Sequence, residues 1–270
     1  MPYDLLKLLP LILAAPAHAQ APEPLAAEIA WVAEGEFCEP ETVLALPDDT
    51  LLVSNVCGFE QQGNGFLTLL DKDGAAIDWR IVEGLDAPLG MTLVNNQLYV
   101  VDNNSVRVFR WPGYAPLRKI LLETAVANDV AVGDDDSVYV TDSARGEVVV
   151  VDPGLEQSVL TGEPQFAGAN GIHVNGDDLW VGGGRLWHVD LRDNTVTTIG
   201  PPWIKGIDGI EQEDRLYEFH ALGIGRTVRL CSQFLRAFCN SLGKPGCRCD
   251  RIHQPPVHCL LAANAFFERT

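Results

Sequence analysis

Four oxygen-bearing side chains occupy corresponding places in a repeated phrase of this 270-residue chain. Two are the carboxylates of Glu41 and Asp208, and two are the carboxamides of Asn128 and Asn170, while Leu89 takes the same place in one further copy. Carboxylate and amide oxygens are the ligands that Ca²⁺ prefers, so these side chains would form a cation site if the fold brought them together. The alternative is that Asn and Asp favour strand starts and turns, although Glu is a poor turn former.

The repeated phrase predicts the fold that would gather them. In its clearest copy, an apolar run from Asn128 is followed by a polar turn and by a second run that ends at Asp142, which predicts two strands and a hairpin. The opening residues of successive copies are 48, 39, 42 and 38 residues apart. A period near forty with several short strands per unit is typical of an all-β β-propeller with four-stranded blades. The first strand of each blade lines the central channel, so the opening residues should converge at one end of it.

The chain is strongly acidic, with a formal net charge of -18. This charge argues against nucleic acid or an anionic membrane as a partner, because neither would attract it. The acidity is uneven, since residues 218–270 hold seven Lys and Arg against three Asp and Glu, whereas the whole chain holds 19 against 37. Two different compositions therefore meet near Tyr217.

The N-terminus resembles a secretory signal. Lys7 precedes an apolar stretch, and Ala17-His18-Ala19 supplies a small-x-small cleavage pattern, so residues 1–19 are predicted to be a signal peptide. A disordered or buried N-terminal helix is the alternative. No later stretch is long and apolar enough to span a bilayer, so we expect a periplasmic or secreted protein. Residues 25–34 are predicted to be a strand that completes the last blade and closes the ring.

The blades are predicted to fill residues 20–217, after which the repeat stops. Residues 218–270 form an atypical basic tail with five of the seven cysteines, as a shifted reading frame would produce, in place of the end of blade five and of blade six. Zinc binding by this tail is an alternative, but its Cys and His spacing matches no common zinc pattern. The two remaining cysteines, Cys38 and Cys57, flank one hairpin, and we expect either a disulfide or two buried thiols there.

Glu41, Asn128-Asp129, Asn170-Gly171 and Asp208-Gly209 resemble the channel residues of the senescence marker protein/gluconolactonase family of six-bladed β-propellers. The resemblance implies that Glu41, Asn170 and Asp208 hold a divalent metal, with Asn128 near the substrate or in a second water shell, and Glu39 is an alternative to Glu41. It also implies hydrolysis of a lactone or related ester, in which the metal polarises the carbonyl group and Asp208 takes a proton from water.

One departure from that family concerns the substrate. Val126 stands where the sugar-lactone hydrolases carry an arginine, and it cannot anchor a polyhydroxylated substrate through hydrogen bonds. We therefore expect a gluconolactonase-like hydrolase, acting as a monomer on a small molecule, without specifying a sugar. The alternatives are a non-catalytic propeller that binds a ligand or a protein, and an inactive truncated relative.

Overall fold

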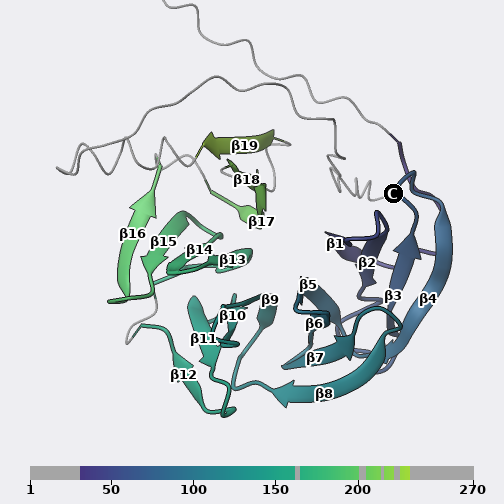
Figure 1. Ribbon diagram of the computed structural model, residues 1–270, viewed down its shortest axis with the longest axis horizontal. Helices are drawn as coiled ribbons and strands as arrows, with labels where there is room; N and C mark the ends of the chain where they lie inside the picture. Colours follow the sequence, from purple (N-terminus) through teal and green to yellow (C-terminus); the bar gives the residue numbers. More distant parts are fainter. Residues whose placement is uncertain (1–30, 162–164, 201–204, 214–215, 222–225, 232–270) are drawn as a thin grey trace, which may run out of the picture.

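The computed structural model describes residues 31–161, 165–200, 205–213, 216–221 and 226–231. Within these ranges every regular element is a β-strand, and the strands form five antiparallel sheets arranged around a common centre (Figure 1). Four sheets have four strands and the last has three. The predicted all-β propeller fold is therefore confirmed. None of the described residues forms a helix that is long and apolar enough to cross a membrane.

Within each sheet the strands follow one another in chain order. The first sheet comprises β1 (Pro40–Ala45), β2 (Leu51–Asn55), β3 (Gly65–Leu70) and β4 (Ala76–Leu85). The second comprises β5 (Pro88–Val94), β6 (Gln97–Asp102), β7 (Ser105–Arg110) and β8 (Ala115–Leu121). The third comprises β9 (Ala127–Val132), β10 (Val138–Asp142), β11 (Glu147–Val151) and β12 (Gln157–Val159). The fourth comprises β13 (Ile172–Asn175), β14 (Asp178–Val181), β15 (Leu186–Asp190) and β16 (Thr195–Ile199), and the fifth β17 (Ile207–Glu213), β18 (Leu216–Ala221) and β19 (Arg226–Cys231).

The first strand of each sheet lies nearest the centre, and strands β4, β8, β12 and β16 lie outermost (Figure 1). Apolar residues from each pair of neighbouring sheets form a buried cluster between them. Leu52 and Met91 share the cluster of the first two sheets, for example, and Trp180 and Ile207 share that of the last two. Among the described residues, no such cluster joins the fifth sheet to the first. The part of the chain from which a sixth blade was expected lies largely outside the described residues.

A buried polar residue ends the second strand of the first three sheets and explains the repeated Asn or Asp at that place. Asn55, Asp102 and Asp142 are each 0% exposed. Asp102 Oδ1 accepts the N–H groups of residues 86 and 87, and Asp142 accepts those of residues 125 and 126. These carboxylates satisfy backbone donors just before the inner strand begins, so they fix the approach of the chain to the channel.

The segment before β1 differs from the prediction of a closing strand over residues 25–34. Residues 25–30 lie outside the described residues, and residues 31–34 form no strand. Instead, Trp31, Ala33 and Phe37 pack with Leu51, Val53 and Leu70. This apolar group lies on the face of the first sheet opposite the second sheet, because Leu51 and Val53 alternate with Leu52. The segment therefore buries apolar side chains of a face that a preceding blade would otherwise cover.

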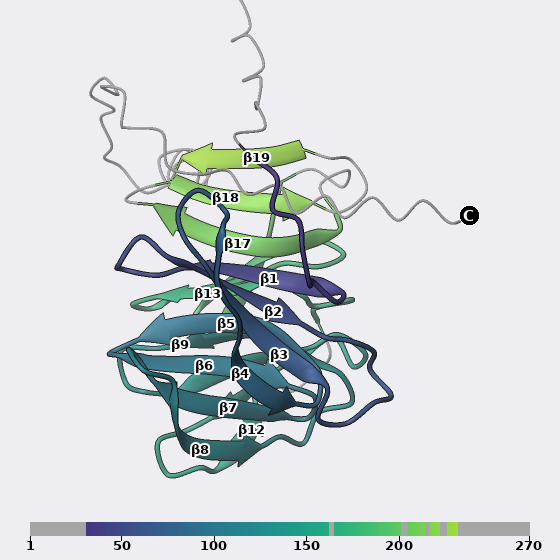
Figure 2. The same ribbon diagram turned by 90° about the vertical axis from the view of Figure 1, so that its right-hand side faces the viewer.

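The fifth sheet extends beyond the boundary predicted at Tyr217. Strand β18 crosses this residue, and β19 pairs with it from Leu216↔Cys231 to Ala221↔Arg226 (Figure 2). The pairing rests on backbone hydrogen bonds, which any sequence without proline can supply. The sequence break at Tyr217 is thus not a break in the sheet. Residues 232–270, including the cysteines and histidines weighed as a zinc site, lie outside the described residues, as does the predicted signal peptide at residues 1–19.

Candidate metal and substrate site

The five opening residues of the repeat lie in, or directly before, the inner strands. Glu41 belongs to β1, Leu89 to β5, Asn128 to β9 and Asp208 to β17, while Asn170 precedes β13 by two residues. Leu89 is 4% exposed and belongs to the apolar cluster between the second and third sheets, so it adds no polar group.

Asn170 and Asp208 are in direct contact. The Nδ2 group of Asn170 donates a hydrogen bond to Oδ1 of Asp208, at 2.5 Å. The bond joins the fourth sheet to the fifth. It uses the Nδ2 atom of Asn170, so the side-chain carbonyl oxygen of Asn170 takes no part in it. Glycine at position 171 permits this approach, because a Cβ there would lie 2.3 Å from the backbone oxygen of Asp208.

Glu41 faces the same region from the other end of the chain. Burial raises its pKa from 4.5 to about 7, a hydrogen bond from the hydroxyl of Thr42 to Oε2 opposes this shift, and the negative charge of Asp208 adds to it. The charge of Asp208 contributes to the raised pKa of Glu41, and both residues are partly buried. Two partly buried carboxylates whose charges interact favour a proton or a cation between them.

Asn128 carries an unsatisfied acceptor. Its Oδ1 atom is buried and has no hydrogen-bond partner among the described residues. An acceptor left in this state costs about 1–3 kcal/mol, and a cation or a ligand hydroxyl or amine group would satisfy it. The residue therefore fits the role of a substrate or metal contact.

Asp129 has a structural role that the sequence did not reveal. Its Oδ1 and Oδ2 atoms accept the backbone N–H groups of Val130, at 2.8 Å, and Ile172, at 3.0 Å. Gly90 leaves room for this carboxylate, because a Cβ at position 90 would lie 2.1 Å from Oδ1. Asp129 thus connects the third sheet to the fourth, next to Asn128 and Asn170. The only sequence signal for this role was the position of Asp129 directly after Asn128 in the repeat.

The predicted alternative ligand Glu39 does not join this group. It is exposed, and its Oε2 atom accepts the backbone N–H of Gly58 at 2.8 Å. Within the described ranges, no three His, Cys, Asp or Glu side chains are grouped as they would be around a metal ion. A cation at the inner strands would therefore depend on the carboxamides of Asn128 and Asn170 as well as on Glu41 and Asp208, and a donor set of this kind suits Ca²⁺.

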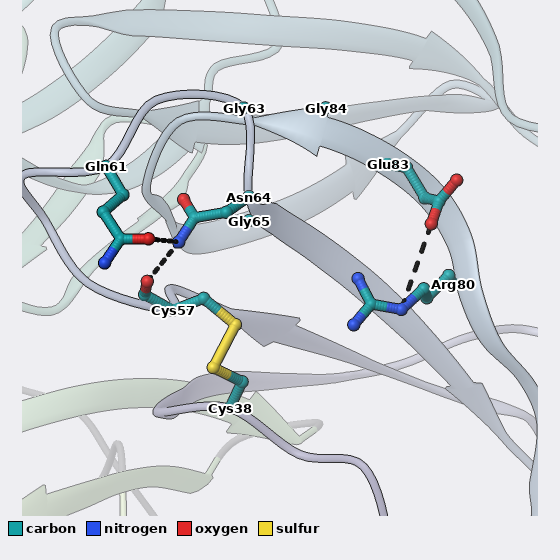
Figure 3. A pocket seen from close by; sticks show the side chains of 9 residues that line it. All are labelled: Cys38, Cys57, Gln61, Gly63, Asn64, Gly65, Arg80, Glu83 and Gly84. Atoms are coloured by element: carbon teal, nitrogen blue, oxygen red, sulfur yellow. Dashed lines mark hydrogen bonds and ion pairs between the residues drawn. A yellow bond between two sulfur atoms is a disulfide. The ribbon is translucent and has the colours of Figure 1, made fainter.

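Cys38 and Cys57 are joined by a disulfide, with their Cα atoms 5.0 Å apart (Figure 3). The bond ties the residues before β1 to the loop after β2. The backbone N–H of Cys57 also donates to the carbonyl oxygen of Cys38 at 3.2 Å. The chain segment that leads into β1 and Glu41 is therefore held by a covalent bond and by a hydrogen bond.

No protein-family model matches the chain, and the comparison with curated proteins gives no match either. Several solved structures are similar in fold. A catalytically inactive virginiamycin B lyase from Staphylococcus aureus with quinupristin is 15% identical, covers 73% of this chain and 68% of its own, and has a TM-score of 0.55. A streptogramin B lyase is 12% identical over 73% and 81% of the two chains, also with a TM-score of 0.55. A nidogen/laminin complex matches at 13% identity over 68% and 74%, with a TM-score of 0.53. Similarity at such low identity supports the fold alone.

Proposed function

We propose that this protein is a metal-dependent hydrolase that opens a lactone or a related ester at the inner strands. The observation that carries the proposal is that Asp208 is hydrogen-bonded to Asn170 and contributes to the raised pKa of Glu41, so that a cation shared by these side chains would relieve the repulsion between the two carboxylates. The unsatisfied Oδ1 of Asn128 supports it, because that atom also needs a partner. Glu41, Asn170 and Asp208 would hold the metal, and Ca²⁺ suits their oxygen atoms.

When bound, such a cation supplies Lewis-acid polarisation of the ester carbonyl group. The chain's own residues provide the remaining functions. Asp208 is oriented by the Nδ2 group of Asn170, and it accepts a proton from the water that attacks the carbonyl carbon. The ring C–O bond then breaks, and the leaving oxygen takes the proton back from Asp208 to become a hydroxyl group. The new carboxylic acid releases its remaining proton to solvent and becomes a carboxylate. Asn128 accepts a hydrogen bond from a substrate donor through Oδ1.

The substrate class is narrowed by the residue two places before Asn128. Val126 is 44% exposed and offers no hydrogen bond to a sugar hydroxyl. Lactones or esters with an apolar substituent are therefore the first compounds to test. We also propose that the protein acts as a monomer in the periplasm or outside the cell, since the disulfide of Cys38 and Cys57 suits an oxidising compartment.

A propeller that binds a ligand or a protein without catalysis is the second candidate. Leu89 supports it, because a buried leucine replaces the polar opening residue of one blade.

Paired measurements of lactone hydrolysis and calcium binding test the proposal. We expect EDTA to abolish hydrolysis and Ca²⁺ to restore it. Asp208→Asn should abolish turnover while reducing calcium affinity only modestly, whereas Glu41→Ala should lose both. Asp134→Asn is the matched control, because Asp134 is exposed in the hairpin between β9 and β10. An active Asp208→Asn variant would exclude this residue as the base, and calcium binding without any hydrolysis would favour the non-catalytic propeller.

A further inference from the structure

A buried hydroxyl group lies between the backbone segments that carry Asn128 and Asn170. It belongs to Thr141, near the end of β10, which is 0% exposed. Its Oγ1 atom accepts the backbone N–H of Asp129 at 2.9 Å, and this N–H belongs to the peptide bond that follows Asn128. The same hydroxyl donates to the carbonyl oxygen of Asn170 at 2.7 Å. One side chain of the third sheet therefore connects the backbone next to both carboxamides.

The bond from Thr141 to Asn170 reaches the chain just before β13 begins. The fourth sheet itself binds the backbone N–H of Asn170, which donates to the carbonyl oxygen of Gly182 at 2.9 Å. A threonine hydroxyl has a single proton to donate. The carbonyl oxygen of Asp129 is also within reach of this proton but lies 3.5 Å away, beyond the usual length of an O–H···O bond. The proton of Thr141 is therefore used for Asn170.

Two neighbouring contacts hold the same stretch of chain against the third sheet. The hydroxyl of Ser143 donates to the carbonyl oxygen of Ala169, and Oδ2 of Asp129 accepts the backbone N–H of Ile172 at 3.0 Å. Together with the hydroxyl described above, they bind the backbone before, at and after Asn170. The direction in which the Asn170 side chain leaves the fourth sheet is thus set by the third sheet.

The fold of a blade does not require threonine at this place. The residue before the buried Asn or Asp that ends the second strand is Ser54 in the first sheet and Val101 in the second. Val101 is 0% exposed, so a valine fits here. Ser54 accepts the backbone N–H of Thr42 at 2.9 Å, within its own sheet. Of these three residues, in the part of the chain that the structure describes, Thr141 is the one whose side chain bonds to the next sheet.

We propose that Thr141 is a positioning residue, whose hydroxyl fixes the spacing between Asn128 and Asn170 and thereby directs the Nδ2 group of Asn170 to Asp208. Strands β9, β13 and β17 are consecutive inner strands around the centre (Figure 1). The bond from Asn170 to Asp208 then extends the influence of Thr141 from the third sheet through the fourth to the fifth. The consequence for a bound metal rests on the proposed function, whereas the direction of the Asn170 side chain does not.

A double-mutant cycle tests the proposal without a metal. The variants Asn170→Ala and Asp208→Ala, alone and together, give the coupling energy between these two side chains from urea unfolding in EDTA. The cycle is then repeated in Thr141→Val. We expect the coupling to fall by about half or more in Thr141→Val and to return in Thr141→Ser, which restores the hydroxyl. A folded Thr141→Val chain with the coupling energy of the parent would overturn the proposal.

Thr68→Val is the matched control. Thr68 is 0% exposed, and its Oγ1 atom accepts a hydrogen bond from Nδ2 of Asn55 at 3.1 Å and donates to the carbonyl oxygen of Trp79 at 2.9 Å. This substitution therefore removes one accepted and one donated bond from a buried strand, as Thr141→Val does, but within the first sheet. It should destabilise the chain and leave the coupling of Asn170 to Asp208 unchanged. An equal loss of coupling in Thr68→Val would reduce the effect of Thr141→Val to general destabilisation and would also overturn the proposal.

Ser143→Ala replaces Thr141→Val in the cycle if the latter does not unfold cooperatively. It removes the neighbouring bond to Ala169 and should lower the coupling in the same direction, so an unchanged coupling there would count against the proposal.

Calcium titration of the same variants by calorimetry separates the proposal from the proposed function. Thr141→Val should bind Ca²⁺ about fivefold more weakly than the parent chain, whereas Thr141→Ser and Thr68→Val should bind it as the parent does. Unchanged calcium affinity in Thr141→Val would overturn its role in the site. A parent chain that binds no Ca²⁺ would refute the proposed function alone, because the double-mutant cycle needs no metal.

Discussion

Replacement of Glu41 by glutamine should stabilise the metal-free protein in alkaline buffer. Burial and the charge of Asp208 raise the pKa of Glu41 from 4.5 to about 7, so the folded state binds a proton that the unfolded state releases. The stability associated with this raised pKa is fully present below pH 4.5 and is lost as the pH rises through 7. One pKa unit corresponds to about 1.4 kcal/mol, so a shift of this size corresponds to about 3 kcal/mol at pH 8. Glutamine removes the charge and keeps the shape.

The assay is urea unfolding of the parent chain and of Glu41→Gln in EDTA, at intervals from pH 4.5 to pH 8. We expect the two free energies of unfolding to be similar at the acidic end. Their difference should grow through the neutral range until the variant is more stable by about 3 kcal/mol. Unfolding slopes should stay equal, because the exposed surface is unchanged. Asp134→Asn, at an exposed hairpin, should follow the parent chain at every pH.

Calcium should stabilise the parent chain more than the Glu41→Gln variant. A cation that binds only the folded state raises the free energy of unfolding with its concentration, and Glu41→Gln removes one of the charged ligands. The parent chain should therefore gain more from Ca²⁺ at pH 8 than the variant does. A constant difference between parent and variant across the pH range in EDTA would refute the buried, raised Glu41 on which both this calculation and the metal site depend.

Three further substitutions test the supports of the site. Gly171→Ala places a methyl group 2.3 Å from the backbone oxygen of Asp208, so it should destabilise the fold by about 1–3 kcal/mol and lower calcium affinity, as measured by calorimetry. Asp129→Asn sets an amide N–H₂ against one of two backbone N–H groups and should cost about 1–3 kcal/mol in urea unfolding; an unchanged midpoint would contradict its role between the sheets. Cys57→Ser opens a disulfide of sequence separation 19 and should cost about 3 kcal/mol, whereas the parent chain in reductant should lose the same amount.

The fold could be predicted from the sequence because each blade of a propeller is one copy of a sequence repeat. The first three copies end their second strand with a polar residue, and in the structure Asp102 and Asp142 use that place to hold the backbone before the inner strand. Such a local requirement recurs in these blades and is visible without coordinates. The packing of Trp31 on the first sheet was not visible in this way. It depends on which face of that sheet is uncovered, and this is a property of the whole ring.

The placement of the opening residues on the inner strands was predictable, but their contacts were not. The repeat identified Glu41 and Asp208 as opening residues, and the structure places them in β1 and β17, where the charge of Asp208 contributes to the raised pKa of Glu41. The sequence could not decide whether Glu41 or Glu39 belongs to the site. In the structure Glu39 accepts a hydrogen bond from the backbone N–H of Gly58, a contact that the sequence does not show. The unsatisfied Oδ1 of Asn128 was also hidden, since hydrogen-bond partners depend on side-chain orientation and on neighbouring sheets.

The two carboxylates come from the first and the last described sheets, and this separation has an energetic consequence. Repulsion between the carboxylates opposes their approach, and a shared cation would reverse its sign. A cation that binds both carboxylates would therefore stabilise the arrangement in which the two sheets present them to one site. Metal binding and the joining of the two ends of the ring should therefore be one coupled equilibrium, so that removal of either carboxylate weakens both.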